Sequence, residues 1–407
     1  MLTREDEYIK AIESDYRKIH VRINTAAGVA LTNNDIETLK WDADSGLGSD
    51  LAIGGVTPAE LDVTLFGQWD EVLSEGTLLE PSMGPQRVYD GGIILETDTI
   101  YWKPLGKFRI RDIFYDANND RTKIKASDLL GDEVWGRTVG EIFGTDTIVG
   151  SAAAFLSSIS SSLGIGGGSN SPAYNKLAAA SLLLPVGGSG PNGVIDYWPQ
   201  LRELTCKEAI GMLAQRLLGF VYLNRSGMLD IKIVSNPSAL PDDAGRYTLG
   251  LNQIYDKGVI RANTPFKPQS IELIVDWLRT NQPSGDTPVY SIVRKDPDAG
   301  DSGIKVDLFN KTFRYSAMNQ EAANLMYKMS ALNNLYPHSV KWTGDPSLEL
   351  GDALTVPPLK SGGTGFDIYV AKYSLSYNGG LSATTSLDLD PTKIVSLNKN
   401  SGRYVNR

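Results

Sequence analysis

The chain has 407 residues, a formal net charge of −9 at pH 7 and a sequence pI of ≈ 5.0. This length predicts about two to four domains, each able to bury its own core, and the acidic balance argues against a nucleic-acid-binding protein. Cys206 is the single cysteine, which excludes an intramolecular disulfide and a cysteine-based metal site. We expect no secretory signal peptide and no membrane span, because no apolar run is long enough.

Residues 1–19 predict an N-terminal helical arm. Thr3 can cap this helix, and Asp6 lies three residues further on. The apolar residues that follow recur at helical spacing: Ile9, Ile12, Tyr16 and Ile19. We expect this face to pack on the first domain, with docking on a neighbouring subunit as the alternative.

Residues 20–135 predict a first β-barrel, because short apolar runs are separated by Gly, Pro, Asn and Asp. The stretch Ala59–Leu65 alternates between apolar and polar positions, which is typical of a half-buried strand. The expected strands are Val21–Ile23, Ile36–Trp41, Leu61–Phe66, Ile93–Leu95, Phe108–Tyr115 and Thr122–Ala126.

Residues 136–195 form an insertion rich in Ser, Gly and Ala. Its aliphatic residues are more numerous than a solvated linker needs, so we expect another chain to cover and order it. The alternative is a segment that folds on its own insertion domain.

Residues 196–335 predict an α+β insertion domain. Thr205–Glu208 is a capping box that opens a helix, and Gly219 is a candidate left-handed residue at the end of that helix. A hairpin follows, with its turn at Asn224–Gly227. A second helix is expected over residues 319–333.

Residues 336–395 predict a second β-barrel, followed by a disordered or partner-bound tail at 396–407. Within the barrel, Trp342–Val356 reads as a strand, a turn, a short strand around Leu348, a second turn and a third strand. Glycine permits φ > 0, aspartate can bond nearby amides and proline fixes φ. We therefore predict a structural corner, without catalytic function, made by Gly344, Asp345, Pro346, Gly351 and Asp352.

The sequence offers no convincing catalytic or metal site. The two histidines, His20 and His338, are far apart and have no nucleophile motif beside them. Gly164–Ser169 lacks the third glycine of a dinucleotide loop, and Asp116–Ser127 lacks the Gly and Glu of a calcium loop. We expect no cofactor, no metal and no enzymatic activity. A glycosidase carboxylate pair stays open, since no pair stands out among many.

Three passages resemble the phage tail or baseplate hub family, which is also found in contractile injection machines. The first is Pro104–Asp128 at the end of the first barrel, where Ile110 stands in place of the usual Val. The second is Arg202–Leu229 in the inserted domain. The third is Trp342–Val356, which reads W-x-G-D-P-x-x-x-x-G-D-x-x-x-V in the second barrel.

The resemblance implies a mainly β chain with an α+β insertion: two tube-type β-barrels plus an inserted helix–hairpin domain. It implies a structural hub at the distal tip of a phage tail, assembled in the host cytoplasm and carried in the virion, with roles in host cell attachment and genome ejection. A homotrimer would join the hexameric tail tube to a threefold tip, and DNA would pass through without specific binding. The implied partners are the tail-tube or distal tail protein, the tape-measure protein and the tip spike or fibre protein.

Two other classes of protein stay open. One is a tail-associated glycan- or peptidoglycan-cleaving enzyme. Some hubs carry a lytic domain after the second barrel, and we expect none here because the chain ends shortly after it. The other is a receptor- or carbohydrate-binding tail protein, which would show clustered aromatic residues, whereas the seven Trp are scattered singly.

Overall fold

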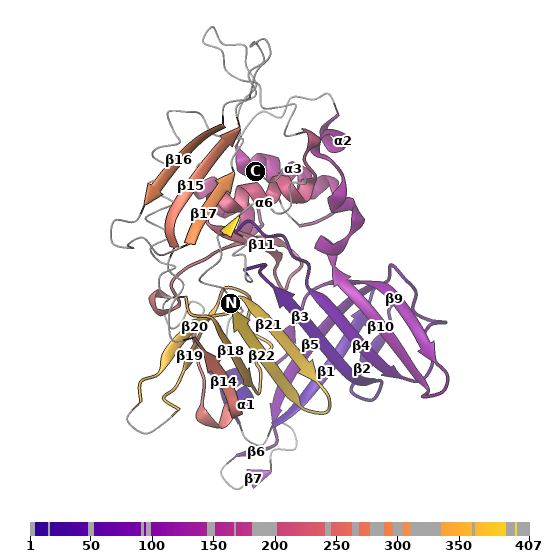
Figure 1. The fold of residues 1–407 in the computed structure, drawn as a ribbon. Helices are drawn as coiled ribbons and strands as arrows, with labels where there is room; N and C mark the ends of the chain where they lie inside the picture. The colour runs from indigo at the N-terminus through magenta and orange to yellow at the C-terminus, as the bar shows by residue number, and fades with distance from the viewer. Residues whose placement is uncertain are drawn as a thin grey trace.

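The computed structural model describes residues 5–14, 17–47, 53–90, 93–94, 99–144, 151–166, 168–180, 202–240, 246–262, 268–276, 289–295, 304–309, 335–359, 363–387 and 395–396. Strands dominate these residues, and the helices between residues 139 and 216 gather at one end of the molecule, away from the N-terminal helix (Figure 1). The mainly β class predicted from the sequence is therefore confirmed.

One large sheet organises the described residues, and every neighbouring pair of strands along its path is antiparallel. In path order the strands are Ile254–Arg261 (β14), His338–Trp342 (β18), Leu381–Leu387 (β22), Lys372–Tyr377 (β21), Ile36–Asp44 (β3), Glu60–Phe66 (β4), Arg121–Asp128 (β10), Phe108–Asp116 (β9), Leu78–Arg87 (β5), Arg17–Thr25 (β1) and Ala30–Thr32 (β2), with Lys103–Pro104 (β8) beside β5.

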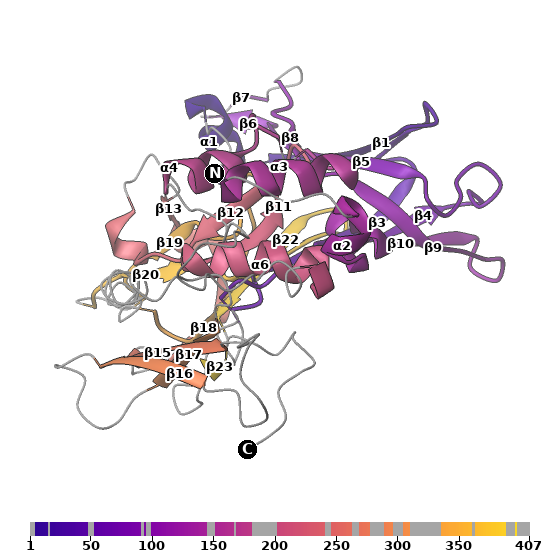
Figure 2. The same cartoon turned by 90° about the horizontal axis from the view of Figure 1, so that it is seen from above.

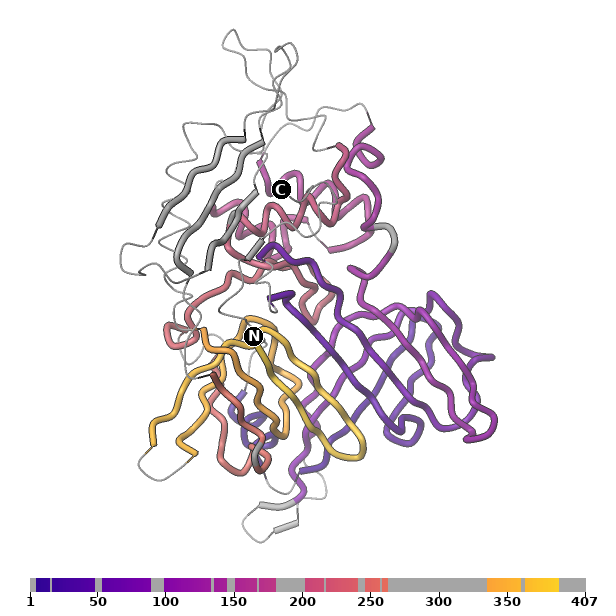
Figure 3. The backbone as a smooth tube through the Cα atoms, viewed as in Figure 1, coloured from indigo at the N-terminus to yellow at the C-terminus, as the bar shows by residue number. Residues whose placement is uncertain are grey.

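Strands from both predicted barrels belong to this one sheet. They meet where β21 pairs with β3, from Lys372 opposite Asp44 to Tyr377 opposite Leu39. We call this pairing the seam, the strands from β3 to β2 the first half, and the strands from β14 to β21 the second half. Among the described strands no pairing returns from β2 to close the sheet, so it forms an open, curved surface and no closed barrel (Figure 3). Alternating polarity predicts half-buried strands but does not specify which strands are neighbours.

Smaller sheets flank the large one. Arg246–Thr248 (β13), Ala353–Val356 (β19) and Phe366–Tyr369 (β20) form a three-stranded sheet beside the second half. A second sheet combines Val289–Lys295 (β16), Pro268–Asp276 (β15), Ile304–Phe309 (β17) and Val395–Ser396 (β23), and a hairpin joins Tyr89–Asp90 (β6) to Ile93–Ile94 (β7). Figure 2 shows β15, β16 and β17 on the opposite side of the molecule from β6 and β7.

Strand pairing crosses the boundary at residue 335 that the sequence predicts. β13 and β14 lie within the predicted insertion range, yet they pair with β19 and β18 of the predicted second barrel. The predicted helix at 319–333 lies outside the described residues, as do 397–407 of the predicted tail.

The inserted domain is helical and ends in the predicted hairpin. Its described helices are Val139–Phe143 (α2), Ala152–Ser162 (α3), Pro172–Ala179 (α4) and Cys206–Arg216 (α6), preceded by the 3-10 turns Leu129–Gly131 (η1) and Glu133–Gly136 (η2). The hairpin pairs Gly219–Leu223 (β11) with Leu229–Ile233 (β12). No helix in the described part of the chain is long and apolar enough to cross a membrane.

The predicted capping box at the start of α6 is confirmed. The Thr205 hydroxyl accepts from the Glu208 amide at 3.2 Å, and Glu208 Oε2 accepts from the Thr205 amide at 2.8 Å. The prediction for Gly219 is wrong, because Leu218 takes the positive φ of 53° and Gly219 begins β11. A Cβ on Gly219 would lie 2.6 Å from the Lys232 carbonyl oxygen, so close packing on β12 requires glycine there.

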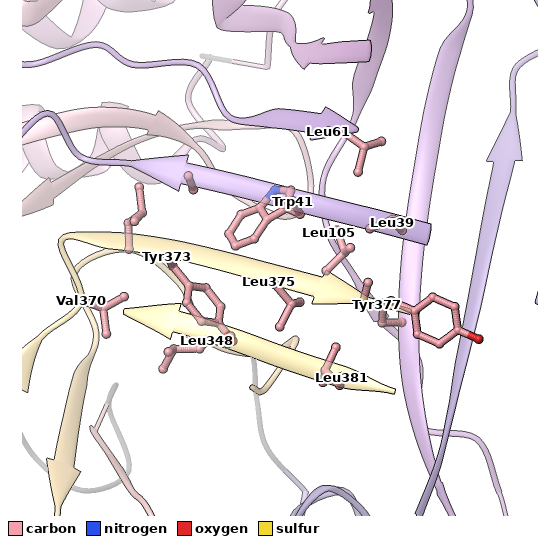
Figure 4. Packing of buried hydrophobic residues seen from close by; sticks show 14 of the residues in the cluster. Leu39, Trp41, Leu61, Leu105, Leu348, Val370, Tyr373, Leu375, Tyr377 and Leu381 are labelled. Carbon is pink, nitrogen blue, oxygen red and sulfur yellow. The ribbon is translucent and has the colours of Figure 1, made fainter. Parts of the chain in front are cut away.

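Two hydrophobic clusters lie in the described residues. The larger one fills both halves of the large sheet and crosses the seam, where Figure 4 shows Trp41 and Tyr373 on adjacent strands. It also includes Tyr8 and Ile12 of the N-terminal helix Asp6–Glu13 (α1). This helix is shorter than the predicted helical arm of residues 1–19, because β1 begins at Arg17 and buries Ile19 in the sheet.

The second cluster belongs to the inserted domain. Phe155, Leu156 and Ile159 of α3 are buried with Leu177 of α4 and with residues of α6 and the hairpin. Small Ala and Ser residues allow these helices to approach closely. For residues 151–180 the alternative reading of the Ser/Gly/Ala-rich segment, folding on its own domain, is therefore confirmed.

Candidate functional site

The histidines and the cysteine occupy structural positions. His20 Nε2 lies 2.7 Å from Gln86 Oε1, and the buried His338 places Nδ1 2.7 Å from the Tyr336 carbonyl oxygen. Burial raises the pKa of Cys206 to about 11, so its thiol stays protonated at neutral pH. In the described residues, no group of three or more His, Cys, Asp or Glu side chains could hold a metal ion.

The most elaborate polar site in the described residues is the predicted corner, residues 344–352. Gly344 and Gly351 both have φ of +80°, as the turn chemistry predicts. A Cβ on Gly344 would lie 2.8 Å from Leu375 Cδ1, and one on Gly351 would lie 2.2 Å from Lys232 Cγ. Both the backbone conformation and the close packing therefore require glycine.

Asp345 ties the corner to two distant segments. Its carboxylate is 1% exposed and accepts hydrogen bonds from the Ser347 amide and hydroxyl, both at 2.7 Å, and from the Tyr8 hydroxyl of α1. Its own amide donates to the Tyr373 hydroxyl at 2.9 Å, and that hydroxyl donates to the Asp345 carbonyl oxygen at 2.8 Å. The N-terminal helix and β21 thus meet at this one residue.

Asp352 closes the other side of the corner. Its carboxylate, also 1% exposed, accepts from the Glu349 amide at 2.8 Å and pairs with Lys232 Nζ of β12 at 3.1 Å. Burial alone would lower the pKa of Lys232, but Asp352 and Glu349 raise it above its usual value, so the ammonium stays charged. Main-chain bonds between Gly351 and Val370 and between Val370 and Asp352, both 2.8 Å, complete the turn.

The predicted short strand around Leu348 is wrong. Residues 347–350 form consecutive turns, and all four are buried. The physical reason is that the Asp345 and Asp352 side chains accept the amides of Ser347 and Glu349, so these amides do not bond a neighbouring strand.

Arg225, in the turn of the β11–β12 hairpin, joins three parts of the molecule. The residue is 4% exposed. Its Nη1 donates to the Leu105 carbonyl oxygen of the first half at 3.0 Å, and its Nη2 donates to the Leu348 carbonyl oxygen of the corner at 2.7 Å. The guanidinium carbon lies 3.8 Å from the centre of the Trp41 ring on β3. Sequence reasoning missed this residue, because Asn224–Gly227 was interpreted only as a hairpin turn.

Two ion pairs, one partly and one largely buried, lead from the inserted domain into the corner. Lys176 of α4 pairs with Asp230 of β12 at 2.6 Å, and Asp230 also accepts from the Tyr222 hydroxyl at 3.0 Å. Two residues further along β12, Lys232 pairs with Asp352. The hairpin therefore connects α4 to the second half through these two ion pairs.

A cavity of ≈ 20 Å³ lies where the hairpin, the first half and the corner meet. Its lining includes Trp41, Leu105, Asp128, Tyr222, Arg225 and Glu349. This volume suits about one water molecule and is far too small for a sugar or a peptide. The arrangement joins the hairpin, the first half and the corner.

Asp128, which lines this cavity, is expected to make stability depend on pH. Its carboxylate accepts from the Ala59 and Leu130 amides at 3.0 and 2.9 Å, and burial raises its pKa to about 7. Since the folded pKa exceeds the unfolded one, the stabilising contribution is full below about pH 4 and is lost as pH rises through about 7.

Chemical denaturation of the wild type and Asp128→Asn from pH 4 to pH 8 measures this effect. We expect the wild type to lose up to about 4 kcal/mol relative to the variant across this range. The exposed Asp112→Asn is the control and should not change the pH profile. A wild-type advantage that is constant with pH would contradict the assignment.

The fold has counterparts among known structures. No family model matches the chain, and no curated protein matches it in sequence. The tail protein from Neisseria meningitidis MC58 matches with a TM-score of 0.52 and 12% identity, covering 93% of this chain and 99% of that chain.

Two further solved structures have lower scores. The 43 kDa tail protein of prophage MuSo2 from Shewanella oneidensis has a TM-score of 0.47 at 11% identity, covering 90% of this chain and 98% of that one. Prophage tail protein gp18 from Listeria monocytogenes EGD-e has a TM-score of 0.43 at 12% identity, covering 91% and 94%. The Neisseria match shows that this chain shares a fold with a tail protein.

Proposed function

We propose that this chain is a structural hub at the distal tip of a phage tail, where three copies form a ring that joins the tail tube to a threefold tip. The fold shared with the Neisseria tail protein over 93% of this chain supports the tail assignment. So do the three passages that resemble hub proteins, in chain order. In this proposal the corner has a structural role and the chain has no catalytic role.

The main observation in support of a ring of three chains is that the large sheet has two strand edges without a partner strand among the described residues. Eight consecutive strands, from β14 to β9, form an antiparallel array across the seam. At one end β14 pairs with β18 alone among the described strands. At the other end only Arg109 and Phe108 of β9 pair with β5, so Asp112–Asp116 pair with β10 alone in the described part of the chain. Unpaired strand edges are templates for strands of another chain.

The directions of the two edges suit a second copy of this chain. Along an antiparallel path of eight strands, the first and the last run in opposite directions. β9 of one copy would therefore lie antiparallel to β14 of the next, as β3 already lies to β21 within the chain. Within the eight-strand array each half contributes four strands, so three copies would present six four-stranded units to a sixfold tube.

Exposed apolar side chains gather at the same two edges. Near the β9 edge, Phe66, Val72 and Phe114 are 40%, 55% and 59% exposed. At the β14 edge, Leu251, Tyr255 and Ile260 are 59%, 43% and 69% exposed. These six are among the eight exposed large hydrophobic residues of the described chain, which favours burial between copies.

Ile260→Glu tests the edge contact. A charge at this position should shift the protein from three copies to one, because burying an unpaired carboxylate between chains is unfavourable. Sedimentation velocity measures the change, and circular dichroism checks that the fold is kept.

Ile233→Glu is the matched control, since Ile233 is 40% exposed and lies on β12 of the inserted domain, outside the large sheet. It should leave the assembly unchanged. A wild type that sediments as one copy, or an Ile260→Glu variant that assembles like the wild type, would contradict the proposed ring.

A further inference from the structure

The Arg225 side chain lies directly beside the seam. It stacks on Trp41 of β3, which is opposite Leu375 of β21 in the pairing and makes an edge-to-face contact with Tyr373 at 5.6 Å. Figure 4 shows Trp41 on β3 and Tyr373 on the adjacent β21, with Leu105 and Leu348 nearby. The hydrogen bonds of Arg225 to these last two residues therefore reach one carbonyl on each side of the seam.

The seam alone leaves the angle between the halves loosely defined. It consists of the strands β21 and β3, and adjacent strands in sheets are rotated by anything from about 10 to 35°. A guanidinium group is planar and presents its donors in a fixed fork. When its two terminal nitrogens bond carbonyls on opposite sides of the seam, the separation of those carbonyls is fixed.

The rest of the hairpin turn supports this position. Gly227 lies so close to the first half that a Cβ there would be 3.0 Å from Lys107 Cδ. Lys232 holds the other end of the hairpin to Asp352 of the second half. Because Arg225 is almost fully buried, losing either carbonyl would leave donors of a charged group without partners, which is strongly unfavourable. The turn is thus held against both halves.

We propose that Arg225 is a positioning residue that sets the angle between the two halves, and through this angle the number of chains in the ring. The second part rests on the proposed function. In a ring, the rotation contributed by each chain must add up to one full turn. A chain whose halves can rotate about the seam no longer specifies one ring size. The inserted domain therefore controls ring size without belonging to the array of strands.

Spin-label distances test the angle. Cysteines introduced at Asn118, in the β9–β10 turn, and at the exposed Lys341 of β18 place one label on each half, and Cys206→Ser removes the native thiol. The background carries Ile260→Glu so that each particle holds one pair of labels. Arg225→Lys keeps the charge but cannot bond both carbonyls through a planar fork, and Arg225→Gln removes the charge. Lys176→Gln is the control, since its ion pair lies wholly within the inserted domain.

We expect a single narrow distance in the parent and in Lys176→Gln, and loss of that single peak in Arg225→Lys. If Arg225→Gln does not fold, Arg225→Lys decides. In the chain with Ile260 intact, native mass spectrometry should show one ring size for the wild type and several for Arg225→Lys. Unchanged distances in Arg225→Lys would overturn the proposal, as would an unchanged ring size. A wild type that forms no ring would instead count against the proposed function, while the distances would still test the angle.

Discussion

Replacing Gly344 or Gly351 by valine is expected to destabilise the second half by about 2–6 kcal/mol. Of this, about 1–3 kcal/mol comes from holding a β-branched residue at φ of +80°. A similar amount comes from overpacking, because the new Cβ would lie 2.8 Å from Leu375 Cδ1 or 2.2 Å from Lys232 Cγ. Thermal and urea unfolding of the purified variants measure the loss.

Gly28→Val separates the two contributions. Gly28 has φ of +81°, but a Cβ there would have no atom within 4 Å. This variant should therefore show the conformational strain alone. Melting temperatures for the Gly344 and Gly351 variants equal to that of the wild type would show that the corner does not limit stability.

Lys232→Met is expected to cost about 3–5 kcal/mol, because it removes the ammonium partner of the buried Asp352. Adding Asp352→Asn should recover part of this loss, since the amide oxygen can still accept from the Glu349 amide and no charge remains at position 352. Urea unfolding of the two single variants and the double variant gives the coupling between the residues.

Lys10→Met is the control for that cycle. The pair Lys10–Glu7 has the same charges, but its side chains are 58% and 49% exposed. Its loss should leave stability nearly unchanged, because solvent screens exposed ion pairs. Equal effects for Lys232→Met and Lys10→Met would show that the buried pair does not anchor the hairpin to the corner.

Local elements could be predicted where the residues that determine them are close together in the sequence. The capping box at Thr205 and the alternating strand at residues 60–66 depend on neighbours in sequence, and both are present. The two corner glycines were predictable for the same reason, because turn chemistry is local. The prediction for Gly219 is wrong, because glycine is required there by close packing against Lys232 on the facing strand and not by a positive φ.

The strand β5 shows why local signals also mislead. The expected strands do not include this segment, which contains Pro81, Gly84 and Pro85, yet it lies between β1 and β9 in the sheet. The amides of Leu105 and Tyr101 donate to the carbonyl oxygens of Pro81 and Pro85. Proline lacks an amide donor but keeps its carbonyl, so the ladder can include it where only acceptors are needed.

The contacts by which Arg225 joins the two halves could not be derived from one sequence. Its partners are the carbonyls of Leu105 and Leu348, more than a hundred residues away in each direction. Every residue has a main-chain carbonyl, so the identity of a residue does not show whether its carbonyl accepts such a hydrogen bond. The pairing of β3 with β21 could not be predicted either, because nothing in the composition of these strands shows that they are neighbours.

Native mass spectrometry of the purified full chain, alone and after addition of the tail-tube protein, tests the central claim most directly. A hub should show a mass of three 44.2 kDa chains, and this ring should bind the hexameric tube protein as a unit. A species of one chain under both conditions, or a ring that does not bind the tube protein, would contradict the account.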